Sequence, residues 1–267
     1  MGLSKRIREG TKKAHNIAEA SSAVILYLKG AVEREAYISL LGDYYHVYNT
    51  LEEAIGKNKK VSALAELDDS ALHRRKALEK DLKYFHGDDW LAKSKPSAAA
   101  IRYGNRIKRI ANTNPELLIA HHYTRYIGDL SGGQALKVIT KNALQLPEKA
   151  LNFYNFTRID NPNEYKKGYR DRLDNLKVIT VGEERLIKEA IRSFKLSCNL
   201  LESMDSESNL LMTFCKLIGR YLTTNYWNAA INGFSFNGIA VHGLMVAGST
   251  SSPTFLELIG AYHTFFL

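Results

Sequence analysis

The sequence is poor in the residues that build disulfide frameworks and in those that interrupt helices. Its 267 residues include two cysteines, Cys198 and Cys215, and five prolines. Two cysteines are too few for a disulfide-stabilised fold or a cysteine-based zinc site, so we interpret both as buried free thiols. The scarcity of proline leaves long stretches of the chain free to be helical.

Long apolar runs and common metal-binding motifs are also missing. No stretch of about 20 apolar residues occurs, so we expect no stable membrane span. The first residues contain no apolar segment of the signal-peptide type. Neither the His-Glu-x-x-His zinc motif nor the Glu-x-x-His pairs of di-iron helix bundles are present. These absences argue against an integral membrane protein and against two classes of metalloenzyme.

Positive charge is in excess, with 37 Lys and Arg against 28 Asp and Glu and a formal net charge of +9. An excess of this size suggests an anionic partner, such as a nucleic acid, a membrane surface, an acidic protein or an acidic small molecule. The basic residues lie in scattered clusters, and no nucleic-acid-binding motif matches. Each cluster taken alone is consistent with a solvated surface.

The apolar residues, 45% of the chain, are enough for one large domain. Their helical spacing runs from Leu3 to about Leu222 without a competing strand pattern, which predicts an all-α fold. Helix starts are indicated by Asn114-Pro115, by Asn161-Pro162 and by a capping box from Thr180 to Glu183. After a first helix that begins at Leu3, the expected helices cover residues 34–55, 69–86, 97–111, 114–144, 162–176, 180 to beyond 194, and 210–222.

The end of the chain differs in kind from the rest. Residues 223–267 contain one charged side chain, Glu257, and are rich in Gly, Ser, Asn and Thr. We therefore expect a domain over residues 1–222 followed by an irregular, nearly uncharged tail over 223–267.

Three glycines, Gly128, Gly132 and Gly133, fall inside one helical pattern. A glycine in a helix interior destabilises it by about 1 kcal/mol relative to alanine. Gly128 and Gly132 are four residues apart and share one face of the helix. That bare face either admits something flat and large or allows close helix packing or a kink near residues 131–133, and spacing alone does not decide. A phosphate-binding loop fits poorly, because no strand precedes these glycines.

Two further pairs of residues are candidates for a chemical role. Asp129 lies among the glycines, and Arg125 is four residues earlier on the same side, where it can hold the carboxylate ionised. His15 lies on the apolar side of the first helix, with Glu19 one turn later as a possible acceptor that would fix the imidazole. An ordinary surface ion pair and a core histidine are the simpler interpretations.

Together, the segments Gly10 to Glu19 and His122 to Gln134 resemble heme oxygenase, and the second segment is long and specific to that family. Further matches are Leu72 to Leu82, Pro115 to Leu118, and Lys166 with Tyr169-Arg170. The resemblance covers about Leu3 to Gly219, so that residues 1–222 would form the heme oxygenase domain. It is nearest in pattern to the biliverdin-forming enzymes of cyanobacteria and algal plastids.

The resemblance implies a multi-helix fold with heme between two helices. His15 would be the proximal iron ligand, and Gly128 and Gly132 would belong to a kinked distal helix over the other heme face. Asp129 would organise waters near the iron-bound oxygen, supported by Arg125, Tyr48 and Tyr126.

The heme propionates are carboxylates that need cations at the pocket mouth. The positions that match the family's propionate side, with one aromatic neighbour, are Arg8, Lys12, Lys166, Arg170 and Tyr123. On the seventh helix this chain has Ser197 where the family often has Asn, so Ser197 is not counted as a site residue.

The implied function is the cleavage of heme, as both substrate and cofactor, at the α-meso carbon to biliverdin, CO and Fe²⁺. The reaction would use O₂ and electrons from an acidic donor such as ferredoxin, and it would supply a bilin reductase in a plastid stroma or a cyanobacterial-type cytoplasm. A non-catalytic heme sensor or carrier on the same fold is the alternative, because fold alone does not establish chemistry. A basic helical protein that binds nucleic acid is a third and weaker possibility.

Overall fold

The computed structural model describes residues 2–20, 22–176 and 180–205, which contain helices and no β-strand. The all-α prediction is therefore confirmed for this part of the chain. The α-helices are α1 Leu3–Glu19, α2 Ser22–Leu28, α3 Arg34–Lys57, α4 Ser62–Leu67, α5 Arg75–His86, α6 Trp90–Lys93, α7 Ala98–Thr113, α8 Leu118–His122, α9 Gly128–Leu144, α10 Pro162–Asp174 and α11 Glu183–Asp205. Short turns complete the set: η1 Gly87–Asp89, η2 Pro115–Leu117, η3 Tyr123–Ile127, η4 Glu148–Ala150 and η5 Asn152–Tyr154.

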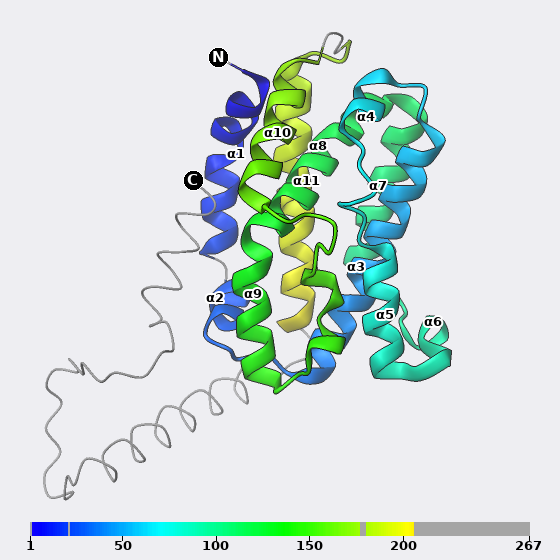
Figure 1. Cartoon of the computed structure of the whole chain (residues 1–267), viewed down its shortest axis with the longest axis vertical. Helices are drawn as coiled ribbons and strands as arrows, with labels where there is room; N and C mark the ends of the chain where they lie inside the picture. The colour runs from blue at the N-terminus through cyan, green and yellow to red at the C-terminus, as the bar shows by residue number, and fades with distance from the viewer. Residues whose placement is uncertain (1, 21, 177–179, 206–267) are drawn as a thin grey trace, which may run out of the picture.

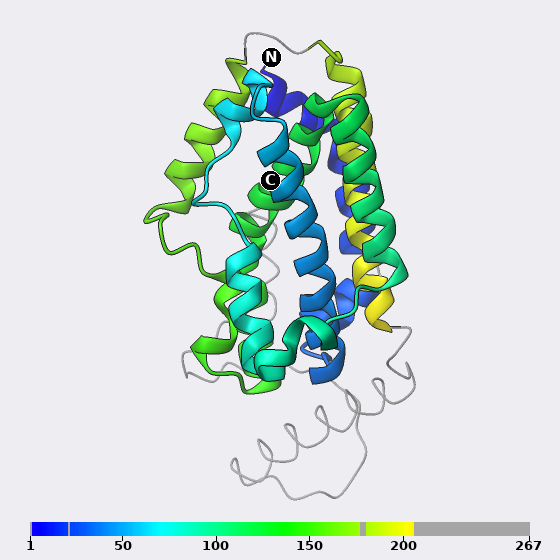
Figure 2. The ribbon, with the colours of Figure 1, turned by 90° about the vertical axis from the view of Figure 1, so that its right-hand side faces the viewer.

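The long helices form a bundle in which α3 packs against α5, α7 and α11. Figure 1 shows α1, α9 and α10 on one side of this bundle and α5 and α7 on the other, and Figure 2 shows the same helices after a quarter turn. The core side of α3 is fully covered, with Leu41, Val47, Tyr48 and Leu51 each 3% exposed or less. Burial of this apolar face stabilises the bundle.

Helix α1 lies directly on α11, and one glycine makes that approach possible. A Cβ built on Gly10 would come within 2.5 Å of Ile187 Cγ2, closer than real Cβ atoms approach. A larger residue at position 10 would therefore push α1 away from α11. The position of α1 matters because it carries His15.

Helix starts agree with the sequence in some places and differ in others. Asn161 accepts hydrogen bonds from the N–H groups of Asn163 and Glu164, so the predicted cap of α10 is confirmed. The predicted capping box at Thr180 is wrong, because Thr180 and Val181 donate instead to Glu116. The expected start of α5 near Asp69 is also wrong: Asp69 accepts from Ala71 N–H in a turn, and the helix begins at Arg75.

The single helix expected over residues 114–144 is divided. Pro115 opens a 3₁₀ turn, α8 follows, and a π-helical turn over Tyr123–Ile127 leads into α9. Such π turns inside α-helices are frequent at functional sites. The kink near residues 131–133, one of the alternatives left open by the glycine spacing, is not where the irregularity lies, since α9 is α-helical from Gly128 to Leu144.

The expected helix over 210–222 and the expected tail over 223–267 lie outside the described residues. Within the part that is described, no helix combines the length and the apolar character needed to cross a bilayer.

Candidate functional site

Two adjoining cavities lie between α1, α9 and α11. The inner cavity has a volume of about 140 Å³ and the outer one about 240 Å³, and both are partly open to solvent. They share His15, Thr124, Gly128 and Phe194 as lining residues, so they form one continuous pocket.

His15 lines the pocket from α1. Its imidazole contacts the ring of Phe194 edge-on, with ring centroids 5.7 Å apart, and the side chain is partly exposed. The packing of α1 on α11 fixes this wall. The side chain of Glu19 is outside the described part of the structure, so its predicted role toward His15 stays a prediction.

The opposite wall is the start of α9, where the glycines have different surroundings. A Cβ built on Gly128 would meet nothing within 4 Å, whereas one on Gly133 would lie 3.6 Å from Tyr154 Cδ1. Gly132 also lines the inner cavity. Both sequence interpretations therefore hold in part: Gly128 leaves open space, and Gly133 packs against a neighbouring ring.

Asp129 and Arg125 form the polar corner of the pocket. Arg125 Nη2 donates to Asp129 Oδ1 at 3.3 Å and Arg125 Nε donates to Tyr48 Oη at 3.1 Å. The guanidinium also lies over the rings of Tyr44 and Tyr48, 4.9 and 5.2 Å from their centroids. These contacts fix the direction in which Arg125 presents its charge to the carboxyl group.

The second oxygen of Asp129 is in a different situation. Oδ2 is buried and has no hydrogen-bond partner among the described residues. Burial raises the pKa of this carboxyl group well above its ordinary value even with Arg125 beside it. A carboxyl oxygen that lines a cavity and lacks a protein partner is suited to holding or releasing a proton there.

Ser197 is a site residue that the sequence analysis left out. It lines the inner cavity, accepts a hydrogen bond from Arg125 Nη1 at 3.2 Å, and donates its own proton to Ser193 O at 3.0 Å. The signal for it was the resemblance, since Ser197 stands where the family often has Asn. Tyr126, predicted as a supporting residue, is fully buried against His122 and is not among the residues lining the two cavities.

The outer cavity carries the basic residues. Arg8, Lys12, Tyr123 and Arg170 all line it, as the predicted propionate side requires. Lys166 does not: it is 4% exposed, and burial lowers the pKa of its ammonium group. The structure thus brings together four of the five residues predicted for the mouth.

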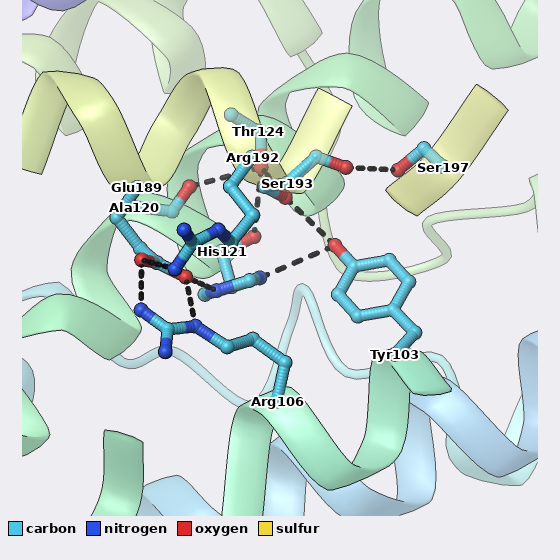
Figure 3. A network of polar contacts seen from close by, with 9 residues as sticks. All are labelled: Tyr103, Arg106, Ala120, His121, Thr124, Glu189, Arg192, Ser193 and Ser197. Atoms are coloured by element: carbon cyan, nitrogen blue, oxygen red, sulfur yellow. Dashed lines mark hydrogen bonds and ion pairs between the residues drawn. The ribbon is translucent and has the colours of Figure 1, made fainter. Parts of the chain in front are cut away.

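A hydrogen-bonded network supports the wall behind Thr124 (Figure 3). Glu189 on α11 accepts from both Nε and Nη2 of Arg106 and lies 2.9 Å from His121 Nε2. Burial opposes ionisation of Glu189, but the hydrogen bonds from Arg106 and His121 lower its pKa to about 2. The network joins α7, α8 and α11.

The same network reaches the pocket wall through hydroxyl groups. Tyr103 Oη lies 3.3 Å from His121 Nδ1 and 2.7 Å from Ser193 Oγ, and Ser193 Oγ lies 2.5 Å from the Thr124 hydroxyl. Neither Glu189 nor His121 was singled out from the sequence, because both contacts join residues far apart in the chain.

The residues present fit a flat, dianionic ligand that carries a metal ion. One imidazole faces the pocket, the facing backbone lacks side chains at Gly128, and an arginine whose Nε has no partner among the described residues, Arg170, lies at the mouth. No cluster of three or more His, Cys, Asp or Glu that could hold a metal occurs in the described ranges. A metal that arrives inside a planar ligand needs one axial side chain from the protein.

Residues 1–203 match the family model described as heme oxygenase. Heme oxygenase 1 of Synechocystis is 38% identical over 223 residues, which cover 84% of this chain and 92% of that protein. Heme oxygenase of Porphyra purpurea is 40% identical over 212 residues, 79% of this chain and 90% of that protein. The crystal structure of the Synechocystis heme oxygenase-1 in complex with heme superimposes with a TM-score of 0.77 at 38% identity, covering 83% of this chain and 100% of that one.

Proposed function

We propose that this chain, which belongs to the heme oxygenase family and cleaves heme to biliverdin, opens the ring at the α-meso carbon. The proposed reaction consumes O₂ and electrons and releases CO and Fe²⁺. The observation that carries this proposal is the pairing of two pocket walls. One wall presents the imidazole of His15, and the other presents bare backbone at Gly128 next to a buried carboxyl group at Asp129.

We propose that His15 binds the heme iron through its imidazole and that the backbone at Gly128 and Gly132 lies over the opposite heme face. Bound heme supplies an iron that takes up O₂ and electrons. Gly128 supports this arrangement because a side chain there would occupy open cavity.

Asp129 is proposed to hold the proton needed beside the distal face. Its pKa is raised by burial, so Oδ2 carries a proton more readily than an exposed carboxylate does. Arg125, itself fixed by Tyr48 and Ser197, holds Oδ1 and leaves Oδ2 without a partner among the described residues. This role is general acid–base assistance through the carboxyl group or through waters that it organises.

The cations Arg8, Lys12 and Arg170 are proposed to bind the two propionates at the mouth, with Tyr123 beside them. Anchoring the propionates there turns the opposite edge of the ring, which carries the α-meso carbon, toward the inner cavity. The choice of the α position therefore rests on charge placement at the outer cavity.

The physiological setting is also a proposal. The formal charge of +9 suits docking of an acidic electron donor such as ferredoxin, with the product passed to a bilin reductase for bilin synthesis. The similarity to cyanobacterial and red algal proteins favours a plastid stroma or a cyanobacterial-type cytoplasm as the location.

The test is a hemin titration followed by turnover. Hemin should produce the Soret band of a histidine-ligated heme, and reduced ferredoxin with O₂ should then yield biliverdin IXα identified by chromatography. A Soret band that appears without any biliverdin would favour the sensor or carrier alternative. His15→Ala should lose the histidine-type band; if the same band persists, the assignment of His15 is wrong.

A further inference from the structure

Three tyrosines line the inner cavity and not the outer cavity that carries the basic residues. Tyr27 on α2, Tyr44 on α3 and Tyr154 on η5 line this cavity together with Gly132 and Gly133. Tyr154 packs on the bare segment of α9, because its Cδ1 lies 3.6 Å from the Cβ position of Gly133. These tyrosines thus line a different cavity from Arg8 and Lys12.

The protons of this cluster can be assigned from one fixed bond. Thr140 Oγ1 lies 2.7 Å from Leu136 O, and a carbonyl oxygen only accepts, so Thr140 donates its single proton there. The 2.5 Å contact between Thr140 Oγ1 and Tyr27 Oη then requires Tyr27 to be the donor. The 3.0 Å contact between the two phenols in turn requires Tyr154 to donate to Tyr27.

In this order Tyr154 is the first donor of the series, and neither Tyr27 nor Thr140 donates to it. If its proton turns toward a ligand, Tyr27 keeps its bond to Thr140 and loses only an accepted hydrogen bond at 3.0 Å. Losing one accepted bond at a hydroxyl oxygen that still donates is a small penalty. Burial raises the pKa of both phenols well above the ordinary value, so both stay protonated donors.

The ligand edge that faces these tyrosines changes its chemistry during the reaction. With the propionates at the mouth, as the proposed function has it, the inner edge of heme offers hydrocarbon groups and a meso C–H. Cleavage at that edge leaves two lactam carbonyl groups on biliverdin, which accept hydrogen bonds. A donor at the inner end therefore finds a partner in the product and not in the substrate.

We propose that the Tyr154 hydroxyl turns its proton from Tyr27 to a lactam carbonyl of the open-chain product and so retains biliverdin more tightly than an apolar wall would. This proposal rests on the proposed function, because that function sets the orientation of the ring. It assigns Tyr154 a preference for product over substrate.

Direct binding of purified biliverdin IXα, without reductant or turnover, tests the proposal. Tyr154→Phe removes one oxygen atom and should weaken biliverdin binding about five- to tenfold, the effect of one net hydrogen bond. Its affinity for hemin should stay within about twofold of the wild type, because the Phe ring preserves the apolar contact. Absorbance titrations measure both dissociation constants.

Two variants serve as matched controls. Tyr45→Phe removes a phenol of α3 whose ring packs on Trp90 and which is not among the cavity-lining residues, so it should change neither affinity. Tyr27→Phe frees Tyr154 of its usual acceptor, so biliverdin should bind at least as tightly as to the wild type. Thermal melting of each variant verifies that it is folded.

The outcomes separate this proposal from the one it rests on. If Tyr154→Phe binds biliverdin like the wild type, or loses hemin affinity to the same extent, the proposal is wrong. If Tyr154→Phe fails to fold, a Tyr27→Phe protein that binds biliverdin several times more weakly overturns the donor order. A wild-type protein that does not bind hemin, or that yields a different biliverdin isomer, contradicts the proposed function instead.

Discussion

Two buried carboxylates, Asp129 beside the pocket and Glu189 behind it, each pair with an arginine. The carboxyl group of Glu189 is bonded by Arg106 and His121, and its pKa falls to about 2. Asp129 has one 3.3 Å bond from Arg125, leaves Oδ2 without a partner among the described residues, and has a raised pKa. The difference lies in how completely the oxygens are hydrogen-bonded, since both side chains are largely buried, at 16% and 4% exposure.

Under the proposed function, this contrast separates a residue that takes part in the chemistry from one that stabilises the fold. A fully bonded buried ion pair fixes three helices against one another, whereas a partly bonded carboxyl group next to a cavity retains the ability to exchange a proton. Removing each group should therefore affect different measurable properties of the protein.

The largest expected effect is on activity when Asp129 is removed. Asp129→Ala should lower the rate of biliverdin formation about 10³-fold, the usual contribution of a positioned acid–base group. The free energy of unfolding should stay within about 1 kcal/mol of the wild type, because burial already disfavours the ionised carboxyl group and Arg125 keeps its hydrogen bonds to Tyr48 and Ser197. Single-turnover assays with hemin-loaded protein and urea unfolding measure the two quantities. A normal biliverdin yield from Asp129→Ala would contradict the role given to this carboxyl group.

Glu189 should show the opposite pattern. Glu189→Gln should destabilise the fold by about 3 kcal/mol at pH 7, because it leaves Arg106 and His121 without a buried anion. Activity per folded molecule should change less than about threefold, since Glu189 does not line the cavities.

The pH dependence of unfolding sharpens this second prediction. The pKa of Glu189 is depressed in the folded protein from 4.5 to about 2. Its stabilising contribution is therefore present above pH 4.5 and is lost as the pH falls from about 4.5 toward 2. The stability difference between wild type and Glu189→Gln should shrink across that window. A difference that stays constant down to pH 2 would show that the ion pair is not its source.

Much of this arrangement follows from local sequence. The helical period and the Asn161 cap predicted α10, and the glycine spacing placed Gly128 and Gly132 on one helix face, which the resemblance interpreted as a pocket wall. These features depend on residues a few positions apart, which is the range over which helix geometry acts.

The remaining features depend on contacts between distant parts of the chain. The bond between Arg125 and Ser197 and the pair Arg106 and Glu189 join residues 72 and 83 positions apart, so no local pattern specifies them. Lys166 was assigned to the mouth by its resemblance to the family. Its spacing of three residues from Tyr169 places it on the buried face of α10, a local signal that the resemblance outweighed.

The smallest expected effect comes from a comparison of two glycines, one that lines the cavities and one that does not. Gly128→Ala should stabilise the fold by up to about 1 kcal/mol, because alanine is the better helix former and its Cβ meets nothing within 4 Å. The same methyl group enters the cavity, so hemin affinity should fall severalfold.

Gly168→Ala on α10 is the matched control, since its Cβ would lie 3.9 Å from Arg172 and it lines neither cavity. It should gain similar stability and bind hemin normally, as measured by thermal melting and absorbance titration. If Gly128→Ala binds hemin as tightly as Gly168→Ala does, the open space at Gly128 is not where the ligand lies, and Asp129 loses its place beside the heme face.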